Sequence, residues 1–251
     1  PSSYYGNLAN RPTGAVPTSS TAFVPYSIYR QASKDYQIQY LKAFSTTMSE
    51  RRMWHVQPDE ATIEIGGTPT QVSGMYLVAE HVGVCAASRP QQNFTRMATV
   101  GISDIAHSNF YFSRTQMRDL ASAGICFMVQ KVPEGVPYVS HALTTDVTAL
   151  FYQEQMKTRN LDFLAYTFLD VMDPFVGKWN QTAGLYTTAR TVLQGKAKLL
   201  MGQTDTIIGP PLLGFKIKTM EQSTVNPDRM IVVLSCAIVD PTNYIDITLE
   251  V

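Results

Sequence analysis

The sequence predicts an α/β fold in which helices flank a layered, mixed sheet. Two patterns lead to this class. A helix, a strand, a hairpin and a second helix follow one another over residues 34–87, an order typical of layered α/β units. Two apolar strands at 125–132 and 138–145 then precede a long amphipathic helix, and strand patterns return towards Val251.

Composition agrees with a globular chain that is long enough to bury a sizeable core. The 251 residues are 45% hydrophobic and only 16% charged, which fits a surface that is partly covered by partners. The formal net charge is zero, so no nucleic-acid partner is expected. Three cysteines, Cys85, Cys126 and Cys236, sit in apolar surroundings and indicate buried thiols in a reducing compartment. No apolar run approaches the roughly 18 residues of a membrane span, and no membrane insertion is expected.

The first helix is predicted at residues 34–52, with Ser33 as its N-cap. Its predicted buried face consists of large apolar side chains spaced by four: Tyr36, Tyr40, Phe44 and Met48. Residues 53–56 then read as a buried strand. A hairpin is predicted at 61–72, turning at the paired glycines, and the small residues of 74–87 indicate a helix that packs closely against a sheet.

Residues 88–112 lack periodicity except for a short predicted strand at 97–102. Ser113 and Gln116 have the spacing of a capping box, so a short helix is predicted to begin there. Gly124 then provides a left-handed C-terminal cap that leads into the next strand.

Two longer helices follow. The first has a 3.6-residue apolar period at Leu161, Leu164, Phe168 and Met172, and Asp173-Pro174 ends it. The second is predicted at 182–201, with an apolar face of Leu185, Ala189, Val192, Leu193, Leu199 and Leu200 and an opposite face of Thr187, Arg190, Thr191, Gln194 and Lys198. Lys196 falls within the apolar face, where it must extend to solvent or mark a contact. Strands are then predicted at 215–219 and 230–239.

The last predicted strand is Tyr244–Val251. Its apolar side chains, Ile245, Ile247, Leu249 and Val251, alternate with Asp246, Thr248 and Glu250, the pattern of a half-buried strand. It follows a turn at Pro241, so it is placed to complete the sheet of another copy by β-augmentation. A strand within its own sheet is the alternative.

Candidate catalytic and metal-binding pairs are incomplete. His81 and Cys85 are four residues apart on a predicted helix, but no second pair completes a metal site. Cys126 and His141 have the residue types of a nucleophile and its base, but both lie in apolar runs. Turn chemistry at a strand end explains the polar cluster at Thr144, and the two Gly-Lys pairs lack the upstream glycine of a phosphate loop. We therefore expect no cofactor, no metal and no catalytic site.

Several of these features occur in an order shared with a known family. There are four such features. They are an Ala-Gly-Ile strand start at residues 123–125, a strand that ends in Thr-Thr at 144–145, a Phe-x-Gly-Lys-x-Asn loop after a helix at 175–180, and closing strands around a Pro-x-Asn-x-Ile turn at 240–251. Over residues 33–251 the chain resembles the C-terminal core of the sheath proteins of contractile phage tails and related injection machines. Members of that family are usually longer than this chain.

The resemblance implies a structural subunit rather than an enzyme. Copies of the chain would polymerise into a helical sleeve around a tail tube protein, contact baseplate and tail terminator proteins, and contract to drive the tube through the host envelope for genome ejection. The subunit would be assembled in the host cytoplasm and belong to the tail of the virion. Residues 1–32 would be an extended arm or linker, 33–135 an α/β layer, and 136–251 the inner, tube-proximal domain ending in a donated strand.

One stretch is a candidate for tube contact. From Lys178 to Gln203 the sequence contains no acidic residue. Because the C-terminal domain of sheath proteins is the part that touches the tube, the candidate tube-facing residues are Lys178, Arg190, Lys196 and Lys198. A solvated cationic face is the alternative.

Two other functions remain open at this level. A non-contractile tail or capsid component would assemble without a contracted state. An α/β enzyme with a dispersed site would form a small closed oligomer instead of long polymers.

Overall fold

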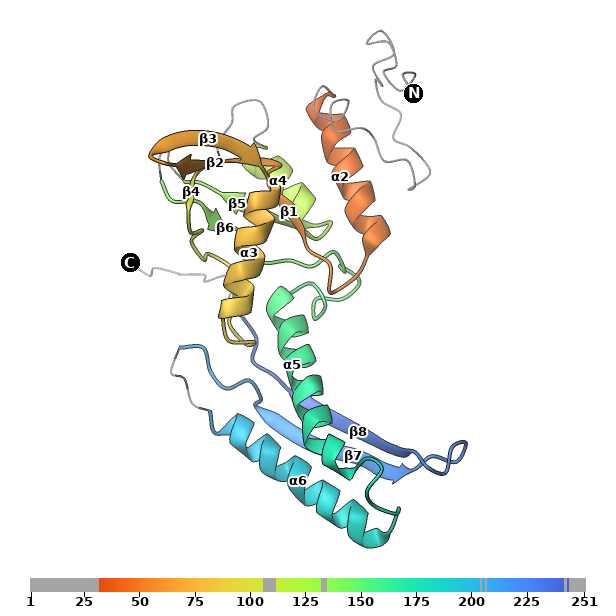
Figure 1. Cartoon of the computed structure of the whole chain (residues 1–251). Helices are drawn as coiled ribbons and strands as arrows, with labels where there is room; N and C mark the ends of the chain where they lie inside the picture. The colour runs from red at the N-terminus through yellow and green to blue at the C-terminus, as the bar shows by residue number, and fades with distance from the viewer. Residues whose placement is uncertain are drawn as a thin grey trace, which may run out of the picture. The chain divides into compact units, whose positions relative to one another are not determined.

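The computed structural model describes residues 32–105, 112–131, 135–203, 205, 207–241 and 243, which form two compact units (Figure 1). The first unit contains the described residues of Pro1–Cys85 and Phe94–Gln155, and the second those of Ala86–Asn93 and Met156–Val251. The main change between the units falls after Gln155, and the predicted division into 33–135 and 136–251 stays a prediction. The predicted N-terminal arm, apart from Ala32, lies outside the described residues.

In its described residues, the first unit combines short strands with three helices. Its elements are α2 (Lys34–Met48), β1 (His55–Gln57), β2 (Glu60–Ile65), β3 (Thr68–Ser73), α3 (Met75–Ala87, which ends just past the unit boundary), β4 (Ile102–Asp104), α4 (Arg114–Ala121), β5 (Ile125–Val129) and β6 (Tyr138–Val139). β5 pairs in parallel with β1 and antiparallel with β6, while β2 pairs antiparallel with both β3 and β4. The sheet that contains β5 is therefore mixed.

Strand β5 separates two apolar cores, because successive side chains on a strand point to opposite faces. Ile125 and Phe127 pack with Ile38 and Leu41 of α2 and with Leu120 of α4. On the other face, β5 contributes a second core that includes Leu77 and Cys85 of α3. Helices thus cover both faces of a mixed sheet, and the predicted layered fold class is confirmed.

Local signals in the sequence predicted several element boundaries correctly. The Ser33 hydroxyl accepts a hydrogen bond from the Tyr36 amide at 3.3 Å. Ser113 and Gln116 form the predicted capping box, with bonds of 3.3 and 2.9 Å between each side chain and the other residue's amide. Gly124 adopts the left-handed conformation, at φ 80°. These signals involve neighbours in the chain, so the sequence alone defines them.

The predicted buried face of α2 is wrong. Of its predicted members only Tyr36 is buried, whereas Ile38, Leu41 and Ser45 make the contact with the rest of the unit. The Ser45 hydroxyl donates to the carbonyl of Ala123 at 2.7 Å, so a polar residue occupies the position that an apolar period assigns to a large side chain. The helix also ends at Met48 rather than at residue 52.

Two predicted strands are shorter than expected. Of residues 138–145, only Tyr138 and Val139 pair with β5. The amides of Thr144 and Thr145 instead donate to the carbonyls of Gln153 and Met53, at 2.8 and 3.0 Å, so their partners lie in loops. Of residues 97–102, Ala98 makes a single bridge and Ile102 begins β4.

The second unit is a hairpin covered by two helices. It contains α5 (Gln155–Met172, whose first residue belongs to the first unit), the single-turn η2 (Asp173–Phe175), α6 (Ala183–Met201), β7 (Gly214–Gln222) and β8 (Met230–Ala237) (Figure 1). Leu164 and Phe168 of α5 pack in one core with Leu193 of α6 and with apolar residues of both strands. Phe168 and Phe215 of β7 have ring centroids 5.1 Å apart. As predicted, α5 ends at Asp173-Pro174.

Helix α6 begins as predicted, because the Thr182 hydroxyl accepts from the Leu185 amide at 3.3 Å. Its buried face is Leu185, Ala189, Leu193, Ala197 and Leu200. Val192 and Leu199, which were predicted to belong to that face, are 38% and 68% exposed. Leu193 lies at the centre of this stripe between Ala189 and Ala197. Val192 and Leu199 point about 100° and 120° away from Leu193 and therefore fall outside it.

Candidate assembly surfaces

The β7–β8 hairpin is the clearest candidate for contact with another chain. Its register runs from Gly214 opposite Ala237 to Gln222 opposite Met230, with an irregularity between Ile217 and Thr219. Side chains on one face form the core with α5 and α6. On the other face Ile231 and Val233 are 37% and 42% exposed.

Both outer edges of this hairpin are open among the described residues, because β7 and β8 pair only with each other there. An open edge presents unpaired backbone N–H and C=O groups, which template the addition of another strand. The hairpin therefore has the geometry of an acceptor for β-augmentation.

The strand predicted to be donated lies outside the described residues. This applies to all of its candidate residues: Tyr244, Ile245, Ile247, Leu249 and Val251. The assignment of this segment to another subunit's sheet stays a prediction.

The candidate tube-facing cations all belong to the second unit. Lys178 lies in the loop after η2, while Arg190 and Lys198 lie on α6, and these three residues are exposed. Lys196 is half-buried at the margin of the α6 core face, in keeping with its predicted position among apolar residues. Within the described part of the chain, no ion pair joins any of these four groups to a carboxylate.

Apolar side chains beside these cations were not predicted from the sequence. Val176 and Trp179 are 73% and 65% exposed around Lys178, and Leu199 is 68% exposed beside Lys198. The cationic surface of the second unit therefore also offers apolar area to a partner. The signal that was overlooked is the spacing of Leu185, Ala189, Leu193 and Ala197 by four, which leaves Leu199 outside the buried stripe.

The His81–Cys85 pair does not form a metal site. His81 is buried, and its Nε2 lies 2.8 Å from Oε1 of Gln155. The amide nitrogen of Gln155 donates to the Leu143 carbonyl at 2.8 Å. The Oε1 atom of Gln155 is therefore an acceptor, and Nε2 of His81 is its donor. Cys85 Sγ lies 3.9 Å from the same histidine nitrogen. The nitrogen nearest the thiol thus carries a hydrogen. No group of three or more potential metal ligands gathers among the residues that the structure describes.

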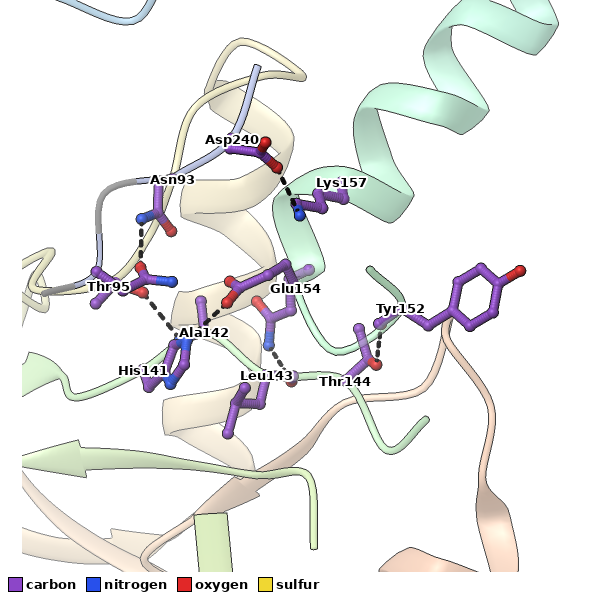
Figure 2. A network of polar contacts seen from close by, with 12 residues as sticks. Asn93, Thr95, His141, Ala142, Leu143, Thr144, Tyr152, Glu154, Lys157 and Asp240 are labelled. Atoms are coloured by element: carbon purple, nitrogen blue, oxygen red, sulfur yellow. Dashed lines mark hydrogen bonds and ion pairs between the residues drawn. The ribbon is translucent and has the colours of Figure 1, made fainter. Parts of the chain in front are cut away.

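Cys126 and His141 do not form a nucleophile–base pair. Burial raises the pKa of the Cys126 thiol to about 12, so the reactive thiolate is not populated at neutral pH. His141 Nε2 lies 2.9 Å from Oε1 of Glu154, with which it forms an ion pair when protonated (Figure 2). Thr144 is also engaged, donating from its hydroxyl to the Tyr152 carbonyl at 2.7 Å, as expected for turn chemistry.

None of the helices in the described ranges is long and apolar enough to cross a membrane.

Neither a protein-family model nor a curated protein sequence matches the chain. Its fold is similar to a chain of the anti-feeding prophage baseplate, with a TM-score of 0.62 and 15% identity over 87% of this chain and 66% of that one. A chain of the contracted anti-feeding prophage helical sheath gives a TM-score of 0.58 and 13% identity over 87% and 67%. A sheath tail protein from Listeria innocua gives 0.56 and 12% over 89% and 53%.

This chain thus spans about half to two thirds of the length of the proteins that it matches. The likeness confirms the resemblance seen in the sequence motifs. The chain has the fold of contractile-tail sheath proteins.

Proposed function

We propose that the chain is a structural subunit of a contractile sheath, which polymerises with copies of itself around a tube. The fold shared with sheath chains supports this function. The observation that carries it is the β7–β8 hairpin, whose two outer edges are open among the described residues. A subunit that exposes two strand edges and donates a strand of its own forms a heterologous contact. Such contacts generate open helical polymers when the rotation between successive subunits does not close into a ring.

The donated strand in this proposal is Tyr244–Val251. It has eight residues, the same length as β8, so it is long enough to pair along the whole outer edge of that strand. Its four alternating apolar side chains would extend the apolar face that β7 and β8 turn towards α5 and α6. Backbone hydrogen bonds would supply affinity and the side chains the register.

The partner enclosed by the sheath would meet the cationic surface of α6. Arg190 and Lys198 are exposed, and the sequence from Lys178 to Gln203 contains no carboxylate to neutralise them. Acidic groups on a tube would form hydrated contacts worth about 0.2–1 kcal/mol each. Many contacts of this size would together hold the sheath on the tube. Each one is weak enough that subunits can detach from the tube one at a time.

Contraction in this proposal is a change between two packings of the same rigid units. The energy difference would lie in the contacts between subunits and be stored during assembly, so no nucleotide is consumed. In a phage, the contracting sheath would drive the tube through the host envelope for genome ejection, with baseplate and terminator proteins at its two ends. The subunit has no catalytic role in this scheme.

Electron microscopy of the purified chain in negative stain tests the proposal. We expect long tubes of uniform diameter, formed by the chain alone or together with its tube protein. A small closed oligomer under all conditions of salt and concentration would contradict a sheath function and favour an enzyme. Tubes that keep one length and diameter under every treatment would indicate a non-contractile component.

A further inference from the structure

The last described residues of the chain are held to the second unit by two side-chain contacts. Nζ of Lys157, in the first turn of α5, lies 2.6 Å from Oδ1 of Asp240 (Figure 2). Nδ2 of Asn93 donates to Oδ1 of Asn243 at 3.0 Å. We call these two contacts, made by Lys157, Asp240, Asn93 and Asn243, the C-terminal anchor.

The ion pair of the anchor is partly sheltered from water. The side chain of Lys157 is 12% exposed, while that of Asp240 is 79% exposed. The lysine thus lies in the packed part of the unit, and the exposed partner is the carboxylate on the final segment. A sheltered cation interacts more strongly with a carboxylate than an exposed one does, because water screens it less.

Asn93 belongs to a segment that is itself well fixed. Within Ala86–Asn93, the Ser88 carbonyl accepts from Nη2 of Arg159 at 3.2 Å, and Nε2 of Gln91 donates to the Gly209 carbonyl at 3.0 Å. Arg89 forms an ion pair with Asp205 at 2.6 Å. The anchor therefore joins the final segment to two supports, the start of α5 and the segment that precedes Phe94.

The position of the anchor sets how much of the chain is free to leave the subunit. β8 ends at Ala237 and Ile238 still packs against the core with α5 and α6, so without the anchor a donated segment would begin at residue 239. Thirteen extended residues, 239–251, span at most about 43–47 Å, whereas the eight residues from Tyr244 to Val251 span at most about 26–29 Å. The anchor thus shortens the reach of the donated segment by more than a third.

We propose that the C-terminal anchor is a positioning device, which fixes the point where the donated strand leaves its subunit and thereby limits it to one neighbouring acceptor. This inference rests on the proposed exchange of the last strand. A longer tether would reach the hairpins of several neighbours in a helical lattice and allow wrong connections. A short tether of fixed origin selects one acceptor in every subunit and carries force to it during a change of packing.

The test uses the full chain with Asp240→Ala, which removes the carboxylate of the anchor, and with Lys157→Met, which removes the cation and keeps the apolar stem. Asp240→Glu retains the charge. Asp119→Asn is the matched control, because it removes one carboxylate from an ion pair with Lys42 (2.8 Å) in the first unit. Thermal unfolding first verifies that each variant is folded.

Backbone order parameters of the unassembled subunit, from NMR relaxation, are the first measurement. In the wild type we expect values of about 0.85 for the amides of Val239, Asp240 and Asn243, the range of rigid backbone. Asp240→Ala and Lys157→Met should lower these values to below about 0.6, the range of flexible backbone, whereas Asp240→Glu and Asp119→Asn should leave them unchanged. Unchanged order parameters in both anchor variants would overturn the anchor, whether or not the chain forms a sheath.

Assembly is the second measurement. Cross-linking of residue 251 in polymers should identify one acceptor position for the wild type and several for the anchor variants, whose tubes should be fewer or irregular. Regular tubes with a single cross-link position in the anchor variants would overturn the positioning role. A wild type that forms no polymer would refute the proposed function instead, and the order parameters would still decide whether the anchor exists.

Discussion

Reversal of the two exposed cations of α6 tests the proposed contact with a tube. The perturbation is the double variant Arg190→Glu and Lys198→Glu. The two residues are eight positions apart on a helix, or about 12 Å along its axis. This separation exceeds the screening length of about 8 Å at physiological salt, so each cation acts on its own acidic partner.

The magnitude follows from their exposure. Each exposed contact is worth about 0.2–1 kcal/mol, so loss of both removes about 0.4–2 kcal/mol per subunit. Reversal adds repulsion of similar size, which brings the total to about 1–4 kcal/mol per subunit. Because 1.4 kcal/mol corresponds to a factor of ten in an equilibrium constant, we expect tube-bound assembly to require roughly five times or more subunit at low salt.

Co-sedimentation of the subunit with preformed tubes, from about 0.05 to 1 M salt, measures this effect. Arg114→Glu with Arg118→Glu on α4 is the control, since it makes the same charge change on exposed positions of the first unit. The difference between the α6 variant and the wild type should shrink towards 1 M salt, where the screening length falls to about 3 Å. Equal binding of variant and wild type at low salt would refute the role of this helix face.

Four further predictions follow from single positions. Ile247→Pro removes a backbone donor in the middle of the proposed exchanged strand, so it should leave a folded subunit that does not form tubes in negative stain; normal tubes would mean that the strand is not exchanged. Cys126→Ala should lower the free energy of unfolding in urea by about 1–2 kcal/mol and leave polymerisation intact, because the buried thiol has no chemical role; a folded variant that fails to assemble would contradict this. Gly124→Ala should cost more than about 3 kcal/mol in the same assay, because φ is 80° and the new Cβ would overlap the Thr144 carbonyl oxygen; a cost below 1 kcal/mol would contradict the conformation of that turn. Burial lowers the pKa of His55 from 6.5 to about 4, so the unfolded chain binds the proton more readily, and stability should fall by up to about 3 kcal/mol as pH drops from 6.5 to 4; His55→Gln should remove that part of the pH dependence.

Signals from residues close together in the sequence predicted the ends of several helices and strands in both units. The capping box at Ser113, the left-handed turn at Gly124 and the helix end at Asp173-Pro174 all depend on residues close in the chain. The face of α2 was not predictable in the same way, because its aromatic residues, spaced by four, form an apolar stripe beside the one that is buried. Burial of Ser45 there depends on a carbonyl of Ala123, which is distant in sequence.

The candidate assembly surfaces show a different limit. Arg190 and Lys198 of α6 are exposed, as their place opposite the apolar face predicted. Leu199 beside Lys198 is exposed too, although an apolar period assigned it to the core. A side chain that is covered only by a partner has the same apolar character as one in the core. Hydropathy therefore identifies such residues but does not say which chain covers them.

The open β7–β8 hairpin is proposed to accept a strand from another copy of the chain. Cryo-electron microscopy of polymers of the purified chain, at a resolution that distinguishes side chains, would show this strand directly. We expect a third strand beside β7 or β8, with the sequence Tyr244–Val251 and a continuous connection to the Asn243 of a different subunit. Polymers in which both edges of the hairpin stay unpaired, or in which Tyr244–Val251 pairs with its own subunit, would contradict it.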